Sequence, residues 1–211
     1  MTKVPFIANS QDDLHCYEAS LKMIMKYFKP ELDFSWEQME SITGKEVGLW
    51  TWPQQGIVWL SQNGFEVINI EIFDYPQFVR EGGDYLISFY GKDGGLEQIK
   101  HSNVAKEQQT CSQFIRQVKT ELRLPNWDDI RRLLSQGYLL GCLVNSSALN
   151  GKEGYVGHFI VLTNILDNSI SFNDPGLPPV ENRRVDLSTF EKAWAYPDNN
   201  AKNLIAVKLK E

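Results

Sequence analysis

Apolar and polar positions alternate at helical spacing through the first third of the chain. The apolar side chains between residues 16 and 28 fit a largely buried helix, which Pro30 ends. Ser35, with Gln38 three residues later, is typical of a capping box. Pro53 suits the first turn of another helix, and Gly64 follows that helix. The pattern therefore predicts helices over residues 16–28, 35–42 and 53–63.

The remainder of the chain changes from mixed to β-rich patterning. Residues 67–73 alternate as a strand, residues 75–80, 85–90 and 112–122 have helical spacing, and the polar stretch 97–110 is expected to be mobile surface. A helix is predicted from Asn126 to about residue 136. Strands are predicted over 138–144, 157–165, 169–172 and 204–209, with a tight turn at Asp167-Asn168 and a short helix over 186–194. This order predicts an α+β fold with helices first and an antiparallel sheet last.

Length and charge narrow the class of protein. With 211 residues, 42% of them hydrophobic, residues 1–211 are expected to form one domain, in which about 73–123 could be a helical insertion or cap. The net charge of -6, without a basic run, argues against nucleic-acid binding. No apolar run approaches the ~18 residues of a membrane helix, and Val4 to Ala8 is too short for a signal-peptide core. We therefore expect a cytoplasmic protein without a membrane partner; its oligomeric state stays open.

The cysteines favour a free thiol. The chain has three, at positions 16, 111 and 142, and no C-x-x-C pair. This count argues against a disulfide framework or a zinc site. We therefore expect no metal and no cofactor.

Cys16 is the strongest candidate for chemistry. It lies where the first helix is expected to begin, and a helix N-terminus favours ionisation of a thiol and offers free N–H groups to an oxyanion. The alternative is core packing, which suits Cys142 within its apolar strand. The side-chain amide of Gln11, just ahead of Cys16, could be a second oxyanion donor, or simply surface.

A base and an acid follow near the other end. His158 comes after Gly157 and enters an apolar strand, so it could face an open cleft. Asp174 follows the next strand, and a hairpin at Asp167-Asn168 would bring it near His158. The alternatives are a strand-edge histidine and a turn aspartate. Together Cys16, His158 and Asp174 have the residue types of a thiol-nucleophile triad.

These segments resemble papain-like cysteine peptidases, and most closely the stand-alone relatives of the peptidases that process double-glycine leaders of bacteriocins. The family's nucleophile segment matches Gln11, Cys16, Ala19 and Met23. Its base segment matches Gly157-His158 and the apolar run after it, and its acid segment matches Asp174-Pro175. The chain differs in having His15 and Tyr17 beside the cysteine, where the leader-processing enzymes have Asp and Gly. The resemblance implies a papain-like fold, with the N-terminal helical part packed on the C-terminal antiparallel sheet.

The resemblance and the residue chemistry together predict a cysteine peptidase or amidohydrolase. Its catalytic residues would be Cys16, His158, Asp174 and Gln11, and its partner a peptide or amide substrate. Gly157 and an aromatic wall of Trp50 and Trp52 would contact that substrate, although buried core is an alternative for both tryptophans. Acyl transfer to an amine on the same triad, and a peptide-binding module without turnover, are the competing functions.

Overall fold

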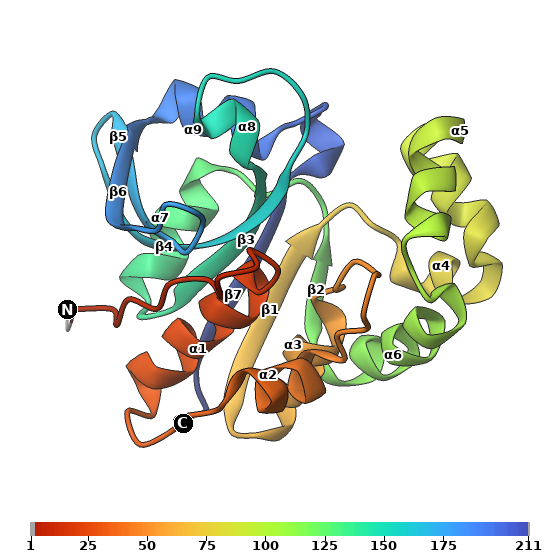
Figure 1. The fold of residues 1–211 in the computed structure, drawn as a ribbon, viewed down its shortest axis with the longest axis horizontal. Coiled ribbons are helices and arrows are strands. Elements are labelled where there is room, and N and C mark those ends of the chain that lie inside the picture. Colours follow the sequence, from red (N-terminus) through yellow and green to blue (C-terminus); the bar gives the residue numbers. More distant parts are fainter. Residues whose placement is uncertain (1–2, 211) are drawn as a thin grey trace.

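The computed structural model describes residues 3–210 as an α+β fold built on one seven-stranded sheet, with the strand order β2-β1-β7-β3-β4-β5-β6 (Figure 1). Only β1 and β2 pair in parallel; the other neighbours are antiparallel. The strands are β1 (Phe65–Glu71), β2 (Lys119–Leu122), β3 (Leu139–Asn145), β4 (Gly157–Leu166), β5 (Ser169–Asp174), β6 (Val180–Asp186) and β7 (Asn203–Leu209). The helices are α1 (Cys16–Phe28), α2 (Trp36–Thr43), α3 (Gln54–Gln62), α4 (Tyr75–Glu81), α5 (Gly83–Lys100), α6 (Val104–Gln117), α7 (Trp127–Ser135), α8 (Ser146–Leu149) and α9 (Leu187–Trp194), with a 3-10 turn at Asn199–Ala201.

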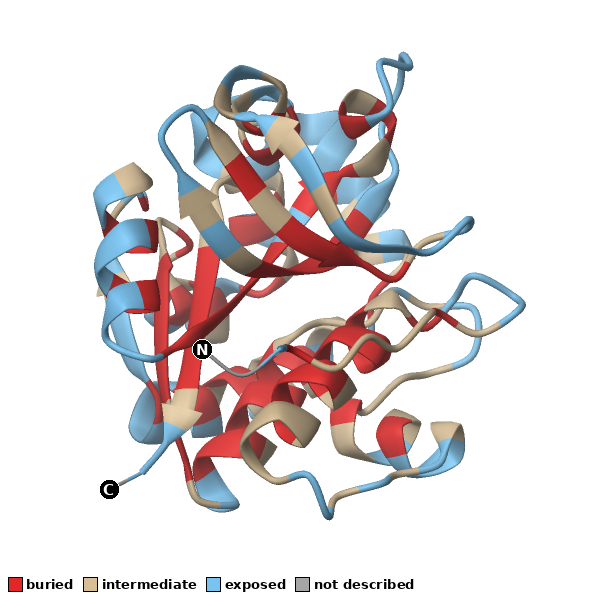
Figure 2. Cartoon of the chain, turned by 90° about the vertical axis from the view of Figure 1, so that its left-hand side faces the viewer, coloured by how far each residue is buried: buried red, intermediate tan, exposed pale blue. Residues whose placement is uncertain are grey.

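Helices cover both faces of the sheet, because side chains of the central strands alternate between two cores. On β4, Phe159 and Val161 join the core beneath α1 to α6, whereas Ile160 and Leu162 join the core beneath α7 and α9. The central strands are accordingly buried on both sides (Figure 2). No helix within residues 3–210 is both long and apolar enough to cross a bilayer.

Capping residues in the sequence correctly predicted where several helices begin. Ser35 caps α2 and exchanges hydrogen bonds with Gln38, as the capping box predicted. Asn126 caps α7 in the same way, with Asp129 as its reciprocal partner. Asp186 caps α9 through Thr189.

Two predictions for the middle of the chain were wrong. Residues 97–110 are the end of α5 and the start of α6 rather than mobile surface, because Ile99 and Val104 pack against the first core and Glu107 is buried. Residues 119–122, expected to extend a helix, form β2. Sequence reasoning also missed β6. Both strands lie at the edges of the sheet and are mostly exposed, so backbone pairing rather than an apolar pattern defines them.

Residues 73–123 therefore contribute α4, α5, α6 and β2. Figure 1 shows the three helices together, on the side of the molecule away from β5 and β6. Their buried residues, which include Phe78, Leu86 and Phe114, join the same core as those of α1 and α3.

Glu107 on α6 makes stability depend on pH. Its side chain is buried, and burial raises its pKa to about 7, with Lys106 opposing the shift and Glu46 adding to it. The folded-state pKa of Glu107 lies above the ordinary value of about 4.3. The contribution of protonated Glu107 to the free energy of unfolding is therefore fully present below about pH 4.3 and is lost as the pH rises through 7. Glu107→Gln should therefore raise the free energy of unfolding by about 2–3 kcal/mol at pH 8 and change it little at pH 4.

Urea unfolding at the two pH values measures this effect. Glu31→Gln is the control, since Glu31 is exposed. An equal gain for Glu107→Gln at both pH values would contradict a titration of Glu107.

Candidate active site

Cys16 is the first residue of α1, as predicted. No side chain caps this helix, and its first backbone hydrogen bond runs from Ala19 N to His15 O (2.8 Å). No hydrogen bond among residues 3–210 occupies the Cys16 N–H. The half-buried thiol therefore lies at the positive end of a 13-residue helix, next to an open N–H donor.

Helix α1 is fixed to the strand that carries the histidine. Ser20 Oγ donates to Phe159 O (3.2 Å), one residue after His158. Tyr17 packs edge-on against the Phe159 ring, with centroids 4.9 Å apart, and donates its hydroxyl to Pro53 O (2.7 Å). The Tyr17 ring is thus buried in the core. These contacts fix the position of Cys16 on α1 relative to β4.

His158 is held by Asp174. Its Nε2 lies 2.7 Å from Asp174 Oδ1, and both side chains are more than 90% buried. Since an ionised carboxylate only accepts hydrogen bonds, Nε2 donates to Asp174, and Nδ1 is the ring nitrogen that stays available to another partner. Burial disfavours the imidazolium, but the hydrogen bond to Asp174 and the interaction with Cys16 outweigh this effect and raise the pKa of His158 to about 9.

Asp174 is the last residue of β5, where pairing with β6 is irregular. Its Oδ1 also accepts from Gly176 N (3.0 Å), and its Oδ2 accepts from Arg183 Nη1 (2.8 Å). Burial favours the neutral acid, but the hydrogen bonds from His158, Arg183 and Gly176 hold the pKa of Asp174 below its ordinary value. Asp174 is therefore an anion that faces a cationic histidine.

Gly176 lies against this pair. A Cβ at Gly176 would be 3.0 Å from Asp174 Oδ1 and 3.3 Å from both Cε1 and Nε2 of His158.

Gly176→Ala should displace the side chains of the His158–Asp174 hydrogen bond and slow alkylation of Cys16 by roughly 10- to 100-fold. Rates of reaction with iodoacetamide measure this. Gly94→Ala, on α5, is the control. Equal rates for Gly176→Ala and wild type would show that the turn at Gly176 accommodates the added methyl group without disturbing the His158–Asp174 hydrogen bond.

Asn9 is a residue that sequence reasoning missed. Its backbone N donates to Pro175 O (2.8 Å), beside the acid, and its side-chain Oδ1 accepts from His15 N (2.7 Å), beside the nucleophile. Its Nδ2 donates to Asp13 Oδ1 (2.7 Å). This buried amide therefore joins the two ends of the site, and no motif in the sequence marks it.

The remaining predicted site residues lie in varied surroundings. Gln11 is exposed on the turn before α1, and no hydrogen bond of its side chain is formed within the described residues. Trp52 packs on Phe78 with stacked rings 5.2 Å apart and donates to Ser102 Oγ (2.8 Å), and Trp50 stacks on His101 (4.9 Å). These contacts join both tryptophans to the helical segment 75–117 and its loops.

Gly157 is exposed next to His158, and Tyr155 lies over it. A Cβ at Gly157 would be 3.0 Å from the Tyr155 hydroxyl, and the Tyr155 ring stacks on Tyr196 with centroids 5.7 Å apart. The Tyr155 side chain is about half exposed, at 53%. Tyr155 was not predicted; an aromatic residue shortly before Gly157-His158 was the available signal.

The other cysteines and histidines do not form a second pair. Cys111 and Cys142 are buried, and burial raises the pKa of both thiols far above the ordinary value. His15 adjoins Cys16, but its Nε2 lies 2.7 Å from Glu40 and its Nδ1 2.5 Å from Ser10 Oγ. His101 is partly exposed and stacks on Trp50. His158 is thus the histidine that faces Cys16.

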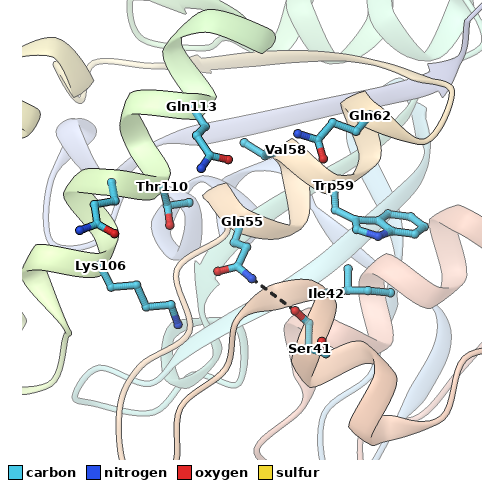
Figure 3. A pocket seen from close by; sticks show the side chains of 10 residues that line it. Ser41, Ile42, Gln55, Val58, Trp59, Gln62, Lys106, Thr110 and Gln113 are labelled. Carbon is cyan, nitrogen blue, oxygen red and sulfur yellow. Dashed lines mark hydrogen bonds between the residues drawn. The ribbon is translucent and has the colours of Figure 1, made fainter.

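A cavity lies elsewhere in the molecule. It has a volume of about 390 Å³ and lies among α2, α3 and α6 (Figure 3). Four of its ten lining residues are glutamines, and Gln55 Nε2 donates to Ser41 O (3.3 Å). The cavity contains no cysteine or histidine; among its lining residues are Ser41, Gln55, Trp59, Gln62, Lys106 and Gln113. Its residues therefore lack a nucleophile paired with a base.

No group of three or more His, Cys, Asp or Glu side chains among residues 3–210 is arranged to hold a metal ion. The chain matches no protein-family model, and no curated protein sequence matches it.

Proposed function

We propose that this protein is a papain-like thiol hydrolase that cleaves a peptide or amide bond. The observation that carries the proposal is the position of His158, which is buried between ionised Asp174 and the Cys16 thiol at the start of α1. A base held by an acid, facing a thiol at a helix N-terminus, is the arrangement that thiol acyl transfer needs. The order Cys, His, Asp along the chain adds support.

Each residue then has one task. Cys16 Sγ attacks the substrate carbonyl carbon, and the oxyanion is stabilised by the Cys16 N–H, with Gln11 as a second donor if its side chain turns inward. The imidazolium of His158 gives its Nδ1 proton to the leaving amine, and a Cys16 thioester remains. His158 then takes a proton from water, the hydroxide adds to the thioester, and the acid product leaves with Cys16 restored. Asp174 accepts from Nε2 throughout.

Two competing functions make different products. Acyl transfer would use the same thioester but pass the acyl group to an amine instead of water. A peptide-binding module would form no thioester at all. The exposed Gly157 and Tyr155 beside His158 would be available to a peptide in every case.

Intact-protein mass spectrometry separates the three. An activated acyl ester should add one acyl group to the wild type and none to Cys16→Ala. Loss of the label in water alone supports hydrolysis, whereas loss only after addition of an amine such as glycinamide supports transfer. If the wild type is not acylated while the free thiol is intact, the thiol-hydrolase proposal fails.

A further inference from the structure

Arg183, at the centre of β6, connects the triad acid to a separate segment of the chain. Its Nη1 donates to Asp174 Oδ2 (2.8 Å), while its Nη2 donates to Leu149 O (2.8 Å) and to Asn150 Oδ1 (2.9 Å). Leu149 ends α8, in the connection between β3 and β4. One guanidinium therefore holds the end of β5 and the β3–β4 connection together.

The sheet register places Arg183 on the side of β5 that carries the acid. Arg183 pairs with Phe172, two residues before Asp174, and its guanidinium carbon lies 5.9 Å from the centre of the Phe172 ring. Residues two apart on a strand share a face, so Arg183 and Asp174 meet. The neighbouring Arg184 projects to the opposite face, where its Nε donates to Ser169 Oγ (2.8 Å).

The segment that Arg183 holds leads directly to the base. Asn145 links the two ends of this segment, residues 146–156. Its Oδ1 accepts from Ser147 N and Val156 N (3.0 Å each), and its Nδ2 donates to Gly154 O (2.8 Å). The segment then continues through Tyr155 into Gly157 and His158. A bond from Arg183 to its middle therefore sets its place relative to Asp174.

We propose that Arg183 is a positioning residue of this site, which fixes the rotation of the Asp174 carboxylate and locks residues 146–156 against it. The inference rests on the proposed function. A carboxylate rotates readily about its Cβ–Cγ bond. Without Arg183, the hydrogen bonds from His158 and Gly176 both fall on Oδ1, and Oδ2 has no partner among the described residues.

Positioning and simple charge predict opposite effects on His158. A nearby cation disfavours a second cation, so if Arg183 acted only through its charge, its removal would raise the pKa of His158. If Arg183 acts by holding Asp174, its removal weakens the hydrogen bond that stabilises the imidazolium, and the pKa of His158 falls. The titratable groups that interact with His158 are Asp174 and Cys16, and the variants below leave both in place.

An NMR titration of the His158 imidazole provides the test. The chain has three histidines, so His158→Ala assigns the signal by its loss. Arg183→Met keeps an aliphatic stem over Phe172 and removes the guanidinium. We expect the pKa of His158 to fall from about 9 towards the ordinary value of about 6.5. Arg184→Met, the matched control on the same strand, should leave it unchanged.

Arg183→Lys completes the design. It keeps the charge but cannot donate to Asp174 and to the α8 end with the same geometry. We expect the pKa of His158 to fall by an intermediate amount in Arg183→Lys. If Arg183→Met does not fold, the pKa measured in Arg183→Lys decides the test. An unchanged or raised pKa in both variants overturns the inference. Failure of the acylation experiment, with the pKa falling as described, would overturn the proposed function alone.

Discussion

Cys16→Ala is expected to abolish turnover of any peptide, amide or ester that the wild type cleaves. The other two thiols are buried and carry raised pKa values, so no second nucleophile can replace the lost sulfur. His158→Ala should lower the rate by about 10⁴-fold or more, because it removes both the partner of the thiol and the proton donor to the leaving group. Initial rates on one substrate measure both variants.

The controls for this prediction separate chemistry from folding. Neither substitution removes a large apolar side chain, so both proteins should still unfold cooperatively. His101→Ala is the matched histidine variant, since His101 stacks on Trp50 and makes no hydrogen bond to Cys16, His158 or Asp174 among the described residues, and it should retain activity. Cys16→Ala protein with more than about a tenth of wild-type activity would place the reaction elsewhere in the molecule.

Asp174→Asn is expected to reduce turnover by about 10²- to 10⁴-fold without abolishing it. The asparagine oxygen can still accept from His158 Nε2. Its amide nitrogen would then replace Oδ2, where Arg183 Nη1 donates, and two donors would face each other. The single amide oxygen can therefore accept from His158 or from Arg183, but one orientation cannot satisfy both.

A double variant tests that explanation. Arg183→Met in the Asp174→Asn background removes the opposing donor, so the double variant should lose less activity than the product of the two single effects. Strict additivity of the two losses, in rates measured on the same substrate, would show that the conflict with Arg183 is not the cause.

Much of the site could be predicted because its parts are local. A cysteine before an apolar helical repeat, a histidine entering an apolar strand and an aspartate after a hairpin are each visible within about ten residues. The observed start of α1 at Cys16 and the 2.7 Å contact between His158 and Asp174 match those local signals. The pairing of β4 with β5 around Asp167-Asn168 brought the last two together.

The parts that could not be predicted depend on partners distant in sequence. Arg183 lies on an edge strand with a polar pattern, and only pairing with β5 places it beside Asp174. Asn9 joins Pro175 to His15 mostly through backbone groups, which have no sequence signature. Only the first half of α6, up to residue 110, was mistaken for surface, because the side chain that it buries there is the polar Glu107.

Labelling of the three cysteines by iodoacetamide is the most direct test that His158 activates Cys16. Peptide mass spectrometry after a short exposure near pH 7 should show Cys16 modified much faster than Cys111 or Cys142. Access alone favours Cys16, because the other two thiols are buried, so the comparison that decides is with His158→Ala, which keeps the access and removes the base. Labelling of Cys16 should slow sharply in this variant. Labelling of Cys16 at the wild-type rate in folded His158→Ala would contradict activation by His158.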